Sequence, residues 1–168
     1  STEALRDFVN GITTSEPVSF VGHSLGGVLV RSLDATGGCK APLHRLVTLG
    51  TPHYGAVIAK TLSKFSMPRA IFGPVLHELG HLNLIEQPQQ IEIACVIGGT
   101  RSRFGFVPIF GEDNDGVVLV REAHLQTCVE HKHVPIYHTF FPYSRRAADL
   151  AAAFLSTGSF TGHHVEQR

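Results

Sequence analysis

Two short motifs in this chain place side chains where they could do chemistry. Residues 22–26 read GHSLG, which fits the pattern Gly-x-Ser-x-Gly and offers Ser24 as a nucleophile. Residues 77–81 read HELGH, which fits His-Glu-x-x-His, a pattern whose two histidines bind zinc while the glutamate acts as general base. The two motifs predict different chemistries, so only one of them can mark a catalytic centre.

The HELGH motif lacks a third metal ligand. A longer zinc-peptidase pattern requires a glycine and then a histidine downstream, where this chain has Leu84 and Gln87. Glu92 is too near His81 to be the glutamate ligand of other zinc peptidases, and it lies in a strand pattern. We therefore expect no metal site here and keep a zinc peptidase as a remote alternative. Residues 66–88 are interpreted as a cap-like insertion in which this motif forms a short helix.

The serine motif has the sequence context that its chemistry requires. An apolar segment at 17–23 predicts a strand before Ser24, and the pattern at 24–36 predicts a helix after it. A sharp turn from strand to helix excludes bulky neighbours, which accounts for Gly22 and Gly26. The context therefore favours a nucleophile presented on a strained turn.

The expected helix start also predicts an anion site. Its free N–H groups and the positive end of its dipole favour a negatively charged intermediate, with the Leu25 N–H as one oxyanion donor. Gly27 would let this helix pack close to the sheet. The alternative interpretation is the glycine-rich turn of a nucleotide-binding fold, but the turn lacks G-x-G-x-x-G and a Lys-Ser/Thr pair.

A serine nucleophile needs a histidine base and a carboxylate that orients the histidine. With this motif the chain order is serine, then Asp or Glu, then histidine. The loop GEDNDGVV offers Glu112, Asp113 and Asp115, and we favour Asp115 because it stands beside a glycine at the loop's end. His138, in PIYHTFF, comes at the end of a predicted strand and is the candidate base. Three further histidines are rivals for this role: His124, His131 and His133.

The elements that must position these residues alternate between strands and helices. This alternation predicts an α/β fold, a mostly parallel sheet with helices on both faces. Besides the elements around Ser24, strands are expected at 44–52, 91–99 and 131–138, and helices at 1–12, 56–65 and 144–155. No repeat or linker interrupts the 168 residues, so 1–168 is interpreted as a single domain.

Composition narrows the possible partners. Lys+Arg and Asp+Glu balance at 14 each, which argues against a nucleic-acid partner.

The cysteines lack the spacing of metal ligands, and we expect them to be small buried or half-buried residues and not a disulfide framework. They are Cys39, Cys95 and Cys128. No apolar run approaches the ~20 residues of a transmembrane segment. No signal peptide is visible, which makes a cytoplasmic location the default, although the start at Ser1 looks truncated and localisation stays unassigned.

Several stretches together resemble a known family. They are VSFVGHSLGGVLVR, LVTLGTPHYGA, GEDNDGVVLV and VPIYHTFF…AAAFLSTGSF. In this order they look like the lipase/esterase branch of the α/β-hydrolase superfamily, close to bacterial lipase-like hydrolases and the GPI inositol-deacylase-like group. The resemblance implies Ser24 as nucleophile, Asp115 as acid and His138 as base, with no metal or cofactor. It also implies pocket-lining residues next to them: His23, Thr51, Pro52 and His53.

The resemblance also suggests the substrate. It implies hydrolysis of carboxylic esters, either small molecules or lipids. The apolar stretches at 65–79 and 103–110 could form a lid or an acyl pocket, and their composition favours an acyl chain over a charged substrate.

The chain departs from the family pattern in its number of strands. A complete sheet has about eight, and the four predicted here resemble the last four, so the N-terminal strands are expected to be lacking. An earlier strand normally leads to the second oxyanion donor, and losing one donor typically costs ~10²–10³ in rate. The strand at 18–22 would then be an exposed edge that pairs with another copy or with an N-terminal segment. The alternative function is a catalytically silent scaffold.

Overall fold

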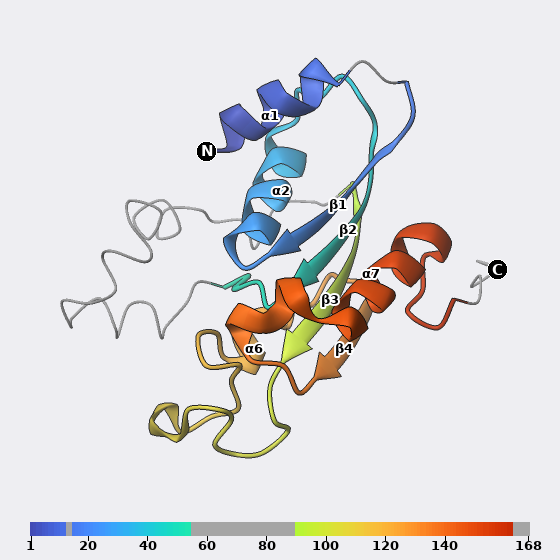
Figure 1. Cartoon of the computed structure of the whole chain (residues 1–168). Coiled ribbons are helices and arrows are strands. Elements are labelled where there is room, and N and C mark those ends of the chain that lie inside the picture. Colours follow the sequence, from blue (N-terminus) through green and yellow to red (C-terminus); the bar gives the residue numbers. More distant parts are fainter. Residues whose placement is uncertain (13–14, 55–89, 163–168) are drawn as a thin grey trace.

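A parallel sheet forms the centre of the molecule. The computed structural model describes residues 1–12, 15–54 and 90–162. Within these ranges four strands pair in the order β1-β2-β3-β4, and each neighbouring pair is parallel. The carboxyl ends of the strands therefore meet at one end of the sheet, where the arrowheads point in Figure 1. The strands are β1 (Val18–His23), β2 (Leu43–Leu49), β3 (Glu92–Gly98) and β4 (Glu130–Val134).

Helices cover both faces of this sheet (Figure 1). On one face α2 packs against β1 and β2, and α1 packs on α2, while α7 packs against β2 and β3 on the other. This arrangement confirms the predicted α/β fold with a mostly parallel sheet. The helical elements are α1 (Thr2–Gly11), α2 (Leu25–Thr36), η1 (Pro108–Phe110), α6 (Val120–Ala123), η2 (His138–Tyr143) and α7 (Arg145–Thr157).

The sheet separates two apolar cores, because successive side chains of a strand point to opposite faces. On the α7 face, Val47 and Val96 are buried together with Phe154. On the α2 face, Leu46 of the same strand β2 is buried together with Val30. β3 is buried along nearly its whole length, as expected for an inner strand of a parallel sheet covered on both faces.

Two strands end earlier than their sequence patterns predicted. The strand expected at 131–138 stops at Val134, because Pro135 has no N–H to continue the ladder. The strand expected at 44–52 likewise stops at Leu49. In both cases the residues beyond the strand become loops at the carboxyl end of the sheet.

Of the remaining predicted elements, two helices are confirmed, and the others lie outside the residues that the structure describes. The helices expected at 1–12 and 144–155 correspond to α1 and α7, each with a serine that caps its first turn. The helix expected at 56–65 lies outside the described residues. The same holds for the cap-like insertion at 66–88 and for HELGH at 77–81 within it.

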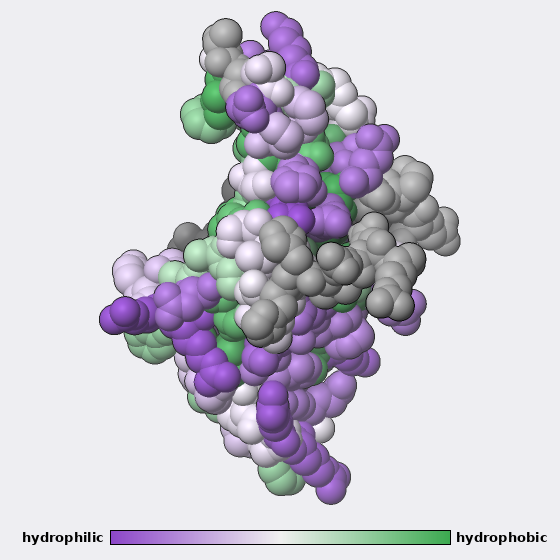
Figure 2. Space-filling view, turned by 90° about the vertical axis from the view of Figure 1, so that its right-hand side faces the viewer, coloured by the Kyte–Doolittle hydropathy of each residue, from purple (hydrophilic) through white to green (hydrophobic). Residues whose placement is uncertain are grey.

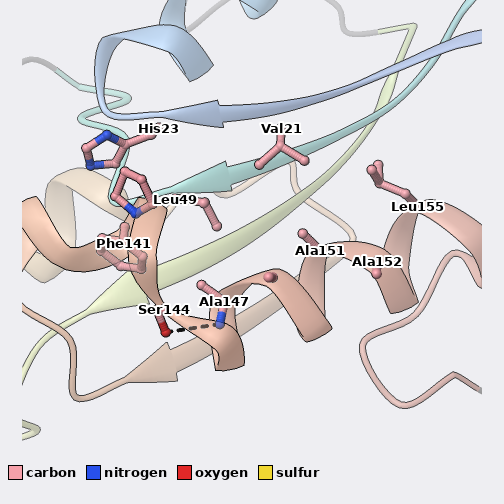
Figure 3. Close-up of a pocket in the computed structure, with 11 residues that line it drawn as sticks. Val21, His23, Leu49, Phe141, Ser144, Ala147, Ala151, Ala152 and Leu155 are labelled. Carbon is pink, nitrogen blue, oxygen red and sulfur yellow. Dashed lines mark hydrogen bonds between the residues drawn. The ribbon is translucent and has the colours of Figure 1, made fainter.

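β1 has a neighbouring strand on one side only, within the described part of the chain. Its Val21 is 51% exposed. An apolar groove lies between this edge and α7 (Figure 3), with Leu49, Ala151 and Leu155 in its lining. Pairing of the edge at 18–22 with another copy or segment stays a prediction.

Hydrophilic and hydrophobic residues share the face that Figure 2 shows. Some large apolar side chains are also exposed, and Ile109 and Tyr143 reach 87% and 84% exposure. Apolar atoms contribute much of the surface of any folded protein, so exposed apolar side chains are ordinary. Among the helices of the described ranges, none has the length and apolar character that crossing a bilayer demands.

Candidate active site

Ser24 lies on a tight turn between β1 and α2. Its φ and ψ are 53° and −123°, a backbone conformation that costs a non-glycine residue about 1–3 kcal/mol. The turn is held by the Ser24 N–H, which donates to the Leu49 carbonyl at the end of β2 over 2.9 Å. Leu25 begins α2, and N–H groups in the first turn of a helix have no acceptor within the helix. The hydroxyl therefore stands at a helix start that can stabilise an anion.

Two glycines make this turn possible. A side chain at Gly22 would bring its Cβ within 2.5 Å of the Gly27 nitrogen, so β1 and α2 approach closely only with glycine there. A side chain at Gly27 would collide with that of Thr51, which confirms that this glycine lets the helix pack close to the sheet. The prediction that Gly26 is crowded was wrong, because a Cβ there meets no described atom within 4 Å.

Two hydrogen bonds connect Ser24 to Asp115 through His138. Ser24 Oγ lies 3.0 Å from His138 Nε2, and His138 Nδ1 lies 2.7 Å from Asp115 Oδ2. A carboxylate only accepts, so Nδ1 carries the ring proton in this geometry and Nε2 can accept the hydroxyl proton. Asp115 is 1% exposed and His138 is 6% exposed, so their interaction is shielded from bulk water.

Two nearby aspartates have different partners in the loop after β3. Asp115 Oδ1 accepts from the N–H groups of residues 117 and 118 at 3.0 and 2.7 Å, which leaves Oδ2 for His138. The carboxylate of Asp113 accepts from the N–H groups of residues 100 and 101 at 2.9 and 2.8 Å and so shapes the loop. The structure therefore brings Asp115 to the histidine and gives Asp113 a role in the backbone turn.

His23 contacts His138 from the end of β1. Its Nε2 lies 3.0 Å from the His138 carbonyl oxygen, and because a carbonyl only accepts, the ring donates Nε2–H. The ring centroids are 4.9 Å apart. Burial lowers the pKa of His23 and the neighbouring His138 lowers it further, so the ring is neutral at pH 7. His23 also lines the groove beside α7 (Figure 3).

The other three predicted pocket residues are buried below the turn. Thr51 Oγ1 donates to the Gly22 carbonyl at 3.3 Å, and the His53 N–H donates to the Glu122 carbonyl at 2.8 Å. Burial also lowers the pKa of His53. The described residues that line the groove in Figure 3 do not include Thr51, Pro52 or His53. A role for them in binding substrate stays a prediction.

The three rival histidines have other neighbours. His131 and His133 lie on β4, as expected from the sequence. The ring of His124 stacks on that of His131 with centroids 3.8 Å apart. His131 Nε2 lies 2.9 Å from the Leu125 carbonyl. The structure therefore brings His138, and not these residues, to the serine.

Gly50 is a site residue that the sequence reasoning missed. It follows β2 with φ of 56°, and a Cβ there would lie 2.9 Å from Asp115 Oδ2 and 3.2 Å from His138 Nδ1. Only glycine lets the end of β2 pass so close to the carboxylate–imidazole pair. A signal was present, because a glycine directly after an apolar strand, as in LVTLG, often marks a close approach at the strand end.

The fold is similar to that of a Bacillus licheniformis lipase, BlEst2. The mature form of that lipase is 20% identical with a TM-score of 0.51, and the match covers 84% of this chain and 70% of that chain. The propeptide form is 21% identical with a TM-score of 0.60, covering 84% of this chain and 38% of that chain. No protein-family model and no curated protein sequence matches this chain. The chain therefore has a lipase-like fold of the α/β-hydrolase type.

Proposed function

We propose that this protein is a serine hydrolase that cleaves carboxylic esters through an acyl-enzyme. The hydrogen-bonded chain from Ser24 through His138 to Asp115 carries the proposal. The similar fold of a lipase supports the same reaction class. Within the α/β-hydrolases we place the protein in the lipase/esterase branch, near bacterial lipase-like and GPI inositol-deacylase-like hydrolases, on the sequence motifs alone.

The mechanism follows from the order of these groups. Ser24 Oγ attacks the ester carbonyl carbon while its proton passes to His138 Nε2, and Asp115 stabilises the resulting imidazolium. The tetrahedral intermediate collapses when Nε2–H protonates the alcohol oxygen, which leaves with the electron pair of the broken C–O bond. Water then attacks the acyl-enzyme with His138 again as base, which releases the acid and restores Ser24. These steps use neither a metal nor an organic cofactor.

The backbone N–H of Leu25 is the proposed donor to the oxyanion. It is the first N–H of α2, directly after the nucleophile, where enzymes with this motif have an oxyanion donor. A donor aimed at the developing negative charge is worth ~10²–10³ in rate. The positive end of the α2 dipole acts on the same charge.

The substrate that we propose is a small-molecule or lipid ester with an apolar acyl chain. The loop that leads from β3 to Asp115 exposes Phe104 (51%) and Ile109 (87%), apolar side chains that an acyl chain could contact. Tyr137, next to His138, is also partly exposed. Apolar side chains of this kind favour an uncharged acyl group over a charged substrate.

A series of p-nitrophenyl esters of increasing acyl length tests the proposal. The wild-type protein is expected to hydrolyse them at least ~10³-fold faster than Ser24→Ala, because an intact triad supplies most of the rate. Equal rates for the two proteins would contradict the assignment of Ser24. The alternative function, a catalytically silent scaffold, predicts that neither protein hydrolyses any ester of the series.

A further inference from the structure

Two thiols and an imidazole lie together on the α2 face of the sheet. Cys95 of β3 is the register partner of His131 of β4, and partners in adjacent parallel strands project to the same face. Cys128 lies in the turn that leads into β4. Its Sγ is 3.0 Å from His131 Nε2, and the candidate ligand atoms of all three residues lie within 4.8 Å of one another.

The cluster of Cys95, Cys128 and His131 is partly buried. Cys95 is fully buried, whereas Cys128 and His131 are half-buried. All three cysteines of the chain are free, so neither thiol of the cluster is committed to a disulfide.

A second layer of polar groups surrounds Cys95. His53 Nε2 lies 3.6 Å from Cys95 Sγ and 3.3 Å from Thr48 Oγ1. Arg31 Nη1 lies 3.1 Å from His53 Nδ1, and because a guanidinium only donates, Nδ1 accepts and Nε2 carries the ring proton. His53 therefore presents an N–H toward Cys95 and Thr48. Hydrogen bonds of this kind orient the first ligands of a metal site.

We propose that Cys95, Cys128 and His131 form a binding site for a zinc ion. Thiolate sulfur and imidazole nitrogen are the ligands that zinc prefers, at about 2.3 Å and about 2.0–2.1 Å. Tetrahedral geometry places such ligand atoms about 3.5–3.8 Å apart, and donors within 4.8 Å of one another reach this spacing with small side-chain movements. Three protein ligands leave the fourth position to water.

Binding has a defined proton balance. The thiols of Cys95 and Cys128 each release a proton to solvent when they become ligands. His131 must bind zinc through Nε2, so its ring proton moves to Nδ1 from Nε2, which in the structure donates to the Leu125 carbonyl over 2.9 Å. The ion would tie β4 to β3, and none of its three ligands belongs to the hydrogen-bonded group of Ser24, His138 and Asp115. We therefore assign it a role in holding β3 and β4 together, outside ester hydrolysis.

Titration of the reduced protein with Co²⁺ tests this site, because sulfur ligands give Co²⁺ a thiolate charge-transfer absorption. The wild type is expected to bind one Co²⁺ per chain, to lose the absorption when Zn²⁺ is added, and to gain thermal stability with Zn²⁺. Cys128→Ser and His131→Asn are expected to weaken Zn²⁺ binding by more than ~10-fold. Cys39→Ser, which changes a thiol outside the cluster, is the matched control and is expected to bind like the wild type.

The half-buried position of Cys128 makes Cys128→Ser the most informative variant, and its circular dichroism shows whether it folds. If the folded wild type binds Co²⁺ without thiolate absorption, or binds none, the proposal is overturned. Thiolate absorption that persists unchanged in folded Cys128→Ser overturns it as well. A Cys95–Cys128 disulfide in the protein as isolated, seen by intact mass as the loss of two hydrogens, would also overturn it, because both sulfurs would be unavailable to zinc.

Discussion

Replacing Asp115 with asparagine should nearly abolish ester hydrolysis while the fold persists. Asp115 Oδ1 accepts two backbone N–H groups at 3.0 and 2.7 Å, and Oδ2 accepts the His138 Nδ1–H at 2.7 Å. In Asp115→Asn the amide oxygen must face the two backbone donors, so the NH₂ group faces His138. The ring can then only accept at Nδ1, and its proton moves to Nε2, where it faces Ser24.

This tautomer of His138 cannot take the proton of the Ser24 hydroxyl. The same change in a serine protease triad lowers kcat by about 10⁴. A tenfold change in rate corresponds to about 1.36 kcal/mol, so the expected loss is about 5.5 kcal/mol of transition-state stabilisation. Unlike Ser24→Ala, the variant Asp115→Asn keeps the nucleophile. Its loss of kcat therefore reports how well the base His138 is oriented.

Asp113→Asn is the matched control, since it makes the same chemical change two residues away. Asp113 caps the N–H groups of residues 100 and 101, so its variant is expected to lose about 1–3 kcal/mol of stability and to keep kcat within about tenfold. Steady-state hydrolysis of one p-nitrophenyl ester and urea denaturation measure both quantities. Near-wild-type kcat for Asp115→Asn, or an equal loss for Asp113→Asn, would refute the reasoning.

Two further predictions concern packing and pH. Gly27→Ala should lower the free energy of unfolding by about 1–3 kcal/mol because its Cβ collides with Thr51, whereas Gly26→Ala, whose Cβ meets no described atom within 4 Å, should be neutral or stabilising by up to about 1 kcal/mol. Equal urea midpoints for the two variants would contradict this packing argument. Burial lowers the pKa of His23 below its usual 6.5, so at a pH near 6.5 the unfolded state binds more protons than the folded state. The free energy of unfolding therefore decreases as the pH falls through 6.5 toward the pKa of His23 in the folded protein. His23→Gln, which can still donate to the His138 carbonyl, should therefore show a shallower fall in Tm between about pH 7.5 and about pH 5.5, and parallel curves would count against a titrating His23.

The turn that carries Ser24 could be predicted because its determinants are local. An apolar strand, two glycines and a helix start lie within about ten residues, and each restricts the backbone by its own sterics. The preference for Asp115 over Asp113 also agrees with the observed contacts, since the glycine beside Asp115 marks the end of the loop. The catalytic roles of these residues stay predictions until activity is measured.

Other features depend on contacts between distant segments and were missed. The register that places Cys95 beside His131 is set by the pairing of β3 with β4, which the spacing of the cysteines does not reveal. Gly50 approaches Asp115 only because β2 ends below the loop after β3. The error at Gly26 has a similar origin, because the space around a helical residue depends on which segments pack against that face.

The central claim is that the fold activates Ser24 as a nucleophile. Labelling the folded protein with a fluorophosphonate, followed by intact mass and peptide mapping, tests it most directly, since the reagent reacts rapidly only with an activated serine. We predict one adduct per chain, located on Ser24, lost in Ser24→Ala and much slower in His138→Gln. A folded protein that remains unlabelled, or that carries its adduct on another residue, would contradict the claim.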